Sequence, residues 1–215
     1  MLKVILLFIL AYLLGSIPTG LWIGKLFYHK DIRQLGSGNM GTTNTFRVLG
    51  RFPGVMVFTI DILKGTLATL LPTLFHISGI SPLWFGLAAI IGHTFSIFAN
   101  FKGGKAVATS AGMLLAYAPH FFIFALSLFL VLTFLTSMVS AASMLSMIIV
   151  TIGTFIFPKY VPWILPHYDY KLSIIAAVLT VFIIWRHREN IQRILNGTEN
   201  RVSFGLFPSK KKKKD

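Results

Sequence analysis

Cysteine is absent from this 215-residue sequence, and charged residues are scarce. Without cysteine the chain has no disulfide framework, no thiolate nucleophile and no Cys-based metal site. Only 12% of its residues are charged and 55% are apolar, whereas a soluble domain has roughly 25% charged residues. Such a chain cannot present a polar surface to water. The composition therefore predicts an all-α integral membrane protein.

The apolar residues form long blocks, most of them near the ~20 residues that cross a hydrocarbon core. We expect about seven transmembrane helices, at residues 2–26, 54–76, 82–100, 106–118, 120–138, 141–158 and 171–186. The first block resembles the core of a signal peptide, but no small-residue cleavage site follows it, so we interpret it as a retained helix. The fourth block is short, and glycines lower its helix propensity, so a five-span alternative stays open.

Lysine and arginine number 20 against six acidic residues, an excess that is typical of proteins that bind nucleic acid or a membrane surface. Their distribution favours the membrane, because they gather in the connections 25–51 and 102–105 and after residue 186. Short loops rich in Lys and Arg stay in the cytoplasm, so seven crossings place the N-terminus outside and the C-terminus inside. No nucleic-acid partner is expected.

The predicted domain organisation is a single polytopic domain over residues 1–208 followed by a Lys-rich cytoplasmic tail at 209–215. The tail is either a solvated end or a segment attracted to anionic lipid head groups, at ~1 kcal/mol per cation near the surface. Membrane lipids are therefore among the expected partners.

Three polar clusters interrupt the apolar pattern, and polar groups at membrane depth are expensive unless they serve a purpose. The first cluster runs from Asp31 to Arg47 and contains a Gly-x-Gly-x-x-Gly string. A dinucleotide fingerprint needs a soluble βαβ unit, which the flanking spans exclude.

Small residues in this first cluster instead let backbone N–H groups face an anion, while hydroxyls and Arg47 complete the shell. The alternative is a flexible loop with a stop-transfer charge pattern. The candidate binding residues are Gly36, Ser37, Gly38, Asn39, Gly41, Thr43, Asn44 and Arg47.

The second cluster joins His93 to the string Lys102-Gly103-Gly104-Lys105. The P-loop spacing is absent, and an alanine stands where a P-loop needs Ser or Thr for magnesium, so no nucleotide is implied. A Gly-Gly-Lys turn that opens a helix still predicts a phosphate site, because free N–H groups and a lysine converge there. We favour Lys105 as the phosphate ligand and Lys102 as an interfacial anchor. For His93, a structural hydrogen bond and a catalytic role are both open.

The third cluster follows the last apolar block and begins at Arg186. We expect it to continue the last helix into the cytoplasm. At helical spacing His187 and Asn190 share one face, so both could reach a substrate. Arg188 and Glu189 point elsewhere, as in an ordinary amphipathic juxtamembrane helix.

Taken together, these residues resemble the bacterial acyl-phosphate:glycerol-3-phosphate acyltransferases, the PlsY family. The resemblance covers nearly the whole chain, and its segments are individually weak but highly specific in combination and order. They are residues 15–18, 31–47, 61–65, 92–93, 101–109 and 186–191. The resemblance implies seven membrane helices in the bacterial plasma membrane, with these motifs meeting at the cytoplasmic face.

The resemblance also implies an activity, the transfer of a fatty acyl group from acyl phosphate to the sn-1 hydroxyl of glycerol 3-phosphate. The products are lysophosphatidic acid and phosphate, in the first acylation step of phospholipid synthesis. No cofactor and no metal is expected, and the soluble enzyme that makes acyl phosphate is a candidate partner. Carried over residue by residue, the positions that hold the phosphates and orient the acceptor are Ser37, Arg47, Lys105, His187 and Asn190. A serine between the fifth and sixth spans also belongs to the site, and both Ser140 and Ser143 fit.

The chemistry agrees with these residue types, because acyl phosphate already carries a good leaving group. Positioning and charge stabilisation then suffice, and no acyl-enzyme is required. Either His187 or a donor phosphate oxygen could take the acceptor's proton. The alternative function is a membrane transporter for a phosphorylated or other anionic solute, whose polar residues should lie near the bilayer midplane rather than at one face. Soluble-type glycerolipid acyltransferases use a His and an Asp that are separated by four residues, a pattern that is absent here.

Overall fold

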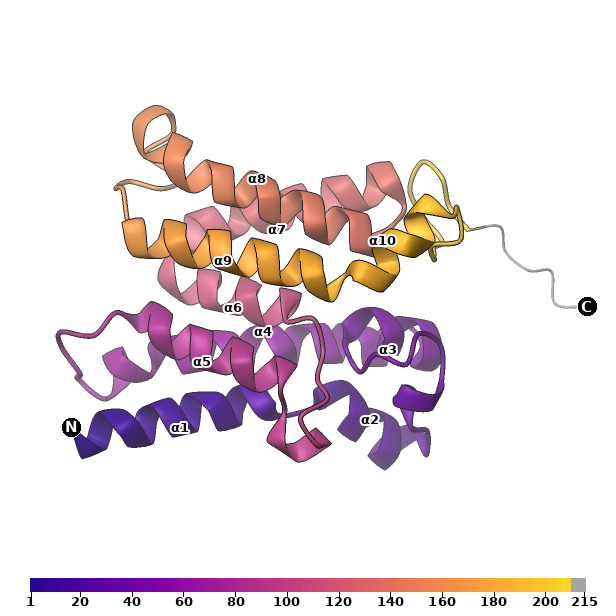
Figure 1. The fold of residues 1–215 in the computed structure, drawn as a ribbon, viewed down its shortest axis with the longest axis horizontal. Helices are drawn as coiled ribbons and strands as arrows, with labels where there is room; N and C mark the ends of the chain where they lie inside the picture. The colour runs from indigo at the N-terminus through magenta and orange to yellow at the C-terminus, as the bar shows by residue number, and fades with distance from the viewer. Residues whose placement is uncertain (210–215) are drawn as a thin grey trace, which may run out of the picture. The chain divides into compact units, whose positions relative to one another are not determined.

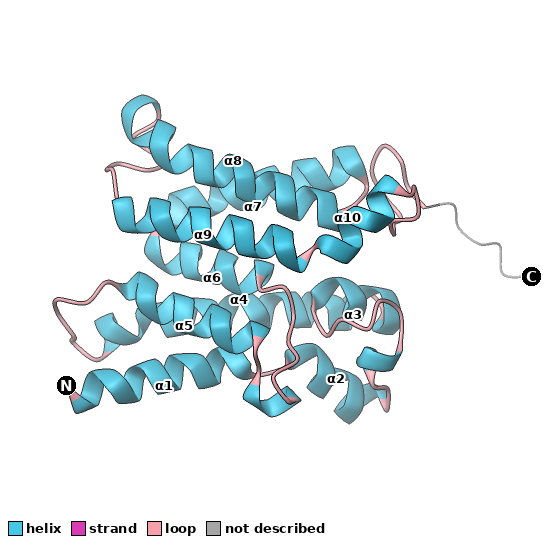
Figure 2. Cartoon of the chain, viewed as in Figure 1, coloured by secondary structure: helices cyan, strands magenta, loops and turns pink. Residues whose placement is uncertain are grey.

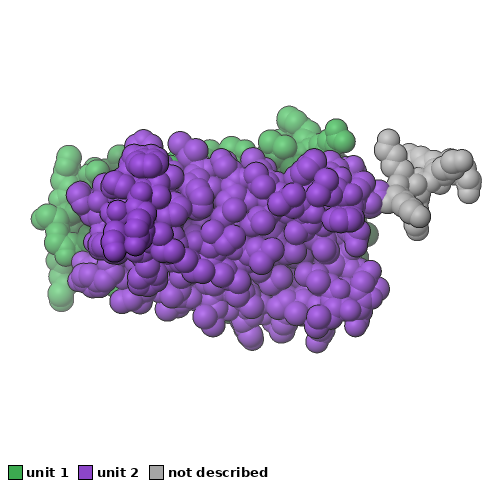
Figure 3. Space-filling view, turned by 90° about the horizontal axis from the view of Figure 1, so that it is seen from above, with its two compact units in different colours: residues 1–119 green, residues 120–215 purple. Residues whose placement is uncertain are grey.

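The computed structural model describes residues 1–209, whose regular secondary structure is entirely helical (Figures 1 and 2). Most of the predicted Lys-rich tail, residues 210–215, lies outside the described part. The chain divides into two compact units, coloured separately in Figure 3: unit 1 is Met1–Pro119, and unit 2 begins at His120. The single domain over 1–208 stays a prediction.

Unit 1 holds six α-helices and two 3-10 helices. They are α1 (Leu2–Ser16), α2 (Thr19–Tyr28), η1 (Ile32–Gln34), α3 (Thr42–Leu49), α4 (Arg51–Leu74), α5 (Pro82–Thr94), η2 (Ile97–Ala99) and α6 (Val107–Tyr117). Up to its described end, unit 2 consists of four helices and the segment that follows them. These helices are α7 (Pro119–Thr136), α8 (Val139–Tyr160), α9 (Tyr170–Arg186) and α10 (Arg188–Leu195).

The first predicted helix, over 2–26, is wrong in its continuity. It is interrupted at Ile17-Pro18, and α1 and α2 meet at an angle of 48°. Proline has no backbone N–H, and its ring clashes with the preceding turn, so the helix cannot run through it undisturbed. The break leaves the Ile17 carbonyl available to another element.

The last helix is also interrupted, which corrects the prediction that it continues through the third polar cluster. α9 ends at Arg186, α10 begins at Arg188, and the two are bent by 59°. His187 is the residue at the bend. Its N–H still bonds the carbonyls of Ile183 and Ile184, at 3.0 and 2.9 Å.

Glycines set the packing of unit 1. A side chain at Gly65 of α4 would collide with the backbone of Thr109 in α6, and one at Gly112 of α6 would collide with that of Ile62 in α4. Gly15 of α1 meets the backbone of α5 in the same way. Membrane helices gain little hydrophobic energy from meeting one another, and small residues let them approach closely enough for van der Waals contact.

Within residues 1–209, four segments are long and apolar enough to cross a membrane: α4, Pro82–Ala99, α7 and α8. If each bent pair, α1 with α2 and α9 with α10, counts as one span, the number rises to six. α6 is apolar but has 11 residues, about 16 Å of helix, which is well short of the ~30 Å hydrocarbon core. The seventh predicted span therefore depends on α6 and stays a prediction.

Candidate active site

The first polar cluster is a loop that leads into α3, and Asn44 organises it. Asn44 is buried, its Oδ1 accepts the N–H of Ser37 at 2.8 Å, and its Nδ2 donates to the carbonyls of Ile32 and Leu35 at 2.9 and 3.0 Å. Gly36 lies in the left-handed region at φ +62°, and a side chain there would collide with Asn44. Asn44, predicted as a binding residue, thus supports the loop from inside.

The other candidates of this cluster lie further toward the surface. Asn39 closes a tight turn by accepting the N–H of Gly41 at 2.9 Å. Ser37, Thr43 and Arg47 are exposed. Arg47 is placed by α3, and its guanidinium lies 3.4 Å from Oδ1 of Asn44. One buried amide therefore links Ser37 and Arg47, two residues that the resemblance assigns to phosphate binding.

The second cluster forms the turn before α6, which confirms that the Gly-Gly-Lys string opens a helix. Ala106 precedes the helix at φ +60°. The N–H of Gly104 donates to the His93 carbonyl at 3.2 Å. A side chain at Gly104 would collide with Nε2 of His93, and one at Gly103 would collide with the His93 carbonyl. Both glycines are therefore required for the turn to lie against His93, and Lys105 follows them directly.

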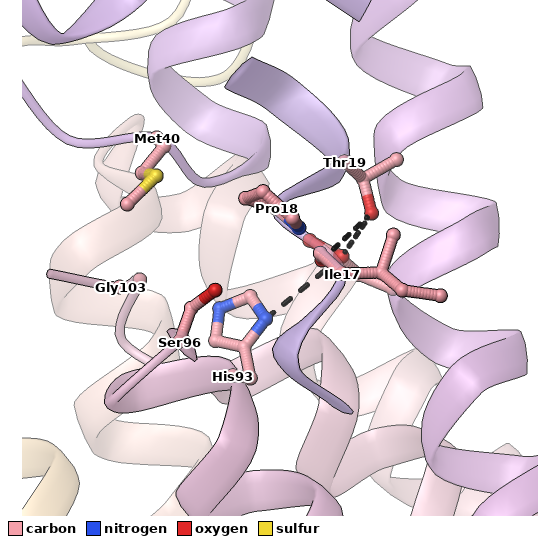
Figure 4. A pocket seen from close by; sticks show the side chains of 9 residues that line it. Ile17, Pro18, Thr19, Met40, His93, Ser96 and Gly103 are labelled. Atoms are coloured by element: carbon pink, nitrogen blue, oxygen red, sulfur yellow. Dashed lines mark hydrogen bonds and ion pairs between the residues drawn. The ribbon is translucent and has the colours of Figure 1, made fainter. Parts of the chain in front are cut away.

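Beneath these two segments lies a buried network, of which only His93 was predicted as a site residue. Asp61 and Lys64 of α4 form an ion pair of 2.8 Å, and each side chain is only 3% exposed. Oδ1 of Asp61 also accepts the hydroxyl of Thr19 at 2.9 Å and lies 3.9 Å from Nδ1 of His93 (Figure 4). Two opposite charges three residues apart in an apolar span are the sequence signal that could have identified it.

A small pocket adjoins this network, with room for about one water molecule. Figure 4 shows Met40, His93, Ser96 and Gly103 around it, and Asp61 and Gly104 also line it. Met40 belongs to the loop of the first cluster and the two glycines to the turn of the second. The two predicted phosphate-binding segments therefore approach the same pocket within unit 1.

In unit 2 the polar residues gather around the carboxylate of Glu199. Ser140 of α8 and Asn190 of α10 donate to its Oε1 at 2.8 and 2.7 Å, and Arg193 donates to its Oε2 at 2.8 Å. Burial alone raises the pKa of Glu199, but these donors outweigh it and hold the pKa below its ordinary value. Ser143 bonds the Val139 carbonyl of its own helix at 2.8 Å. Of the two candidate serines, Ser140 is thus the one grouped with Asn190.

His187 is buried at the bend between α9 and α10. Its Nδ1 lies 2.8 Å from the Ile183 carbonyl. A carbonyl can only accept, so Nδ1 carries the hydrogen, and in the neutral ring Nε2 holds the lone pair. This arrangement suits a general base that acts through Nε2.

Comparison with known proteins identifies the family. The sequence model described as glycerol-3-phosphate acyltransferase matches residues 5–197. The chain belongs to this family. Among its relatives, the glycerol-3-phosphate acyltransferase of Enterococcus faecalis is 64% identical, over 99% of this chain and 98% of the relative. That of Lactococcus lactis subsp. lactis is 56% identical over 100% of both chains.

Two crystal structures of PlsY (YgiH), an integral membrane glycerol 3-phosphate acyltransferase, are similar to this chain. The glycerol 3-phosphate form has a TM-score of 0.82 at 38% identity and covers 93% of this chain and 96% of that one. The lysophosphatidic acid form has a TM-score of 0.77 at 37% identity and covers 93% and 95%. The predicted family and the prediction of an all-helical, multi-pass integral membrane protein are confirmed.

Proposed function

We propose that this protein transfers a fatty acyl group to glycerol 3-phosphate and releases lysophosphatidic acid, with acyl phosphate as the donor. The observation that carries the proposal is the similarity over 93% of the chain to a solved acyltransferase known in a glycerol 3-phosphate form and a lysophosphatidic acid form. Acyl phosphate as donor agrees with a site rich in cations and glycine turns, since both substrates then bring a phosphate.

Within this proposal, Arg47 and Lys105 bind phosphate oxygens, and the N–H groups of the glycine-rich loop and turn complete the shell. Nε2 of His187 takes the proton of the sn-1 hydroxyl, while Ser140 and Asn190 orient the acceptor. The hydroxyl oxygen bonds to the acyl carbon, the bond from that carbon to the phosphate oxygen breaks, and phosphate leaves. The fixed tautomer of His187 supports its role, since its lone pair sits on the nitrogen that does not face Ile183.

The reaction is tested with purified protein in detergent. We expect one lysophosphatidic acid and one phosphate for each acyl phosphate consumed, in the presence of glycerol 3-phosphate. A transporter for an anionic solute would release no phosphate, because detergent abolishes any gradient. A pulse with labelled acyl phosphate alone should leave the protein unacylated, and an acyl-serine peptide that glycerol 3-phosphate chases would contradict direct transfer.

The proposed membrane arrangement has seven spans, the N-terminus outside, and the site facing the cytoplasm of the bacterial plasma membrane, where a soluble enzyme could deliver acyl phosphate. Because the chain has no cysteine, single cysteines report topology without a background. We expect Gln34→Cys and Thr198→Cys to be shielded from an impermeant reagent in intact cells and His76→Cys to be labelled. Labelling of Gln34→Cys from outside would contradict the arrangement.

A further inference from the structure

Asp61 and Lys64 have no part in the proposed chemistry, yet they are among the most deeply buried ionisable groups of unit 1. A buried ion pair is seldom retained for stability, because the desolvation of both charges offsets their attraction. Ionisable residues inside a membrane span usually serve a function. The contacts of the pair indicate which function.

The first set of contacts leads to the loop of Ser37 and Arg47. Asp61 accepts the hydroxyl of Thr19, and Lys64 donates to the Ile17 carbonyl at 2.9 Å, the carbonyl that the α1–α2 break leaves available. The residue after Thr19 is Gly20, where a side chain would collide with the Met40 carbonyl. The start of α2 is thus hydrogen-bonded to α4, and its next residue packs against the glycine-rich loop.

The second set leads to the turn that carries Lys105. Oδ1 of Asp61 lies 3.9 Å from Nδ1 of His93, and the other ring nitrogen of His93 faces Gly104 so closely that no side chain fits there. The His93 carbonyl accepts the Gly104 N–H at 3.2 Å. His93 therefore lies between the carboxylate and the backbone of the turn.

We infer that Asp61 is a positioning residue that holds the loop before Arg47 and the turn before Lys105 in one geometry, with Lys64 as its counter-charge. Every contact in this argument lies within unit 1. The carboxylate accepts the Thr19 hydroxyl in a charged, and therefore stronger, hydrogen bond, and it lies 3.9 Å from the ring of His93. The loop and the turn both line the small pocket next to Asp61, through Met40 and through Gly103 and Gly104. The inference rests on the proposed function, because it takes Arg47 and Lys105 as phosphate ligands.

The test replaces both charges together, as Asp61→Leu with Lys64→Met. Removal of one partner would leave an uncompensated buried charge and could prevent folding, whereas apolar replacement of a whole pair is often neutral or stabilising. Asp169→Asn is the control, since Asp169 caps α9 through the N–H groups of Lys171 and Leu172 and Asn caps equally well. For each protein we measure the Tm in detergent, kcat, and KM for acyl phosphate and glycerol 3-phosphate.

We expect the double variant to fold with a Tm near that of the native protein and to raise the KM of a phosphate substrate at least ~10-fold, because phosphate ligands that are out of position lose strong, charged hydrogen bonds to the substrate. The KM that rises should include the one raised by Lys105→Ala, and Asp169→Asn should match the native protein. Native KM values in a folded double variant would overturn the inference. So would a loss of kcat alone, since a smaller active fraction lowers kcat and leaves KM unchanged.

A second measurement separates this inference from the proposed function. If the native protein makes no lysophosphatidic acid, the proposed function fails, but stabilisation by inorganic phosphate still reports the anion site. We then expect phosphate to raise the Tm of the native protein and of Asp169→Asn but not that of the double variant. An equal rise in all three proteins, or no rise in any, would overturn the role of Asp61.

Discussion

In unit 1 the helices approach until backbone meets backbone, whereas in unit 2 side chains keep them apart. Gly65 and Gly112 bring α4 and α6 together without an intervening side chain. In unit 2, α7 and α8 meet through side chains: the ring of Phe157 lies 4.8 and 5.6 Å from those of Phe124 and Phe121, between centroids. The span in α7 is 17% buried, against 50% for the span in α4.

The difference parallels the places where each unit carries its proposed site residues. The proposed phosphate ligands of unit 1 sit beside or within loops, which need support from below, and Asn44, His93 and Asp61 supply it. The proposed catalytic residues of unit 2 sit at helix ends, where the helix itself provides a carbonyl for His187 and α10 presents Asn190 to Glu199. Rigid backbone packing is thus found in the unit whose site is built from loops.

The largest effect should come from unit 2, with His187→Ala. If Nε2 of His187 is the general base, its loss should lower kcat by ~10²–10⁴-fold. The measurement is turnover with both substrates saturating, on protein whose Tm is unchanged. A loss below ~10-fold would assign the base to a substrate phosphate oxygen, and the base of the reaction would then lie in no side chain of unit 2.

The second-largest effect on activity should come from the proposed phosphate ligands of unit 1. Arg47→Ala and Lys105→Ala should each lower kcat/KM at least ~10-fold, since a charged hydrogen bond contributes ~1.5–3 kcal/mol. Lys102→Ala is the matched control, three residues from Lys105 and exposed, and should change kcat/KM little. Equal losses in all three variants would indicate general electrostatic attraction rather than two specific phosphate contacts.

The packing of the two units can be compared by adding one methyl group to each, through a Gly→Ala substitution. Gly112→Ala should destabilise the protein by about 1–3 kcal/mol, because the new Cβ meets rigid backbone of α4. Gly153→Ala of α8 should be milder, since its Cβ would lie 3.2 Å from the ring of Phe121, which can turn aside. Thermal unfolding in one detergent measures both. Equal losses of stability would remove the distinction between the two units.

The smallest effect concerns Glu199, whose folded-state pKa lies below its ordinary value of 4.5. A depressed pKa stabilises the folded state fully above the ordinary pKa, and this contribution is lost as pH falls through the folded-state pKa. Glu199→Gln, which weakens charged hydrogen bonds to neutral ones, should cost about 1 kcal/mol near pH 7. The difference in Tm from the native protein should shrink as pH falls below 4.5. If the Tm difference stayed constant with pH, the charge of Glu199 would not contribute to the stability of the folded state.

Much of the local structure of the candidate site could be predicted, because short segments of sequence encode it. A Gly-Gly-Lys string before an apolar block predicts a turn that opens a helix, and α6 begins where expected. Pro18 is the sequence signal for the first helix break, but the long apolar block over residues 2–26 predicted one continuous helix. The bend at His187 has no Pro or Gly to announce it. Helical spacing grouped His187 with Asn190, and the structure places His187 directly before α10, the helix that carries Asn190.

The sequence by itself determined the class, the family and the residue types of the candidate site, because block length, charge placement and motif order can be taken from the sequence without the fold. Only the tertiary structure decided that Asp61 meets Thr19 and His93, and that Ser140 rather than Ser143 joins Asn190. Those pairings link residues 32–50 positions apart. They depend on how close the helices come, and in unit 1 that closeness is set by glycines with no side chain to keep the backbones apart.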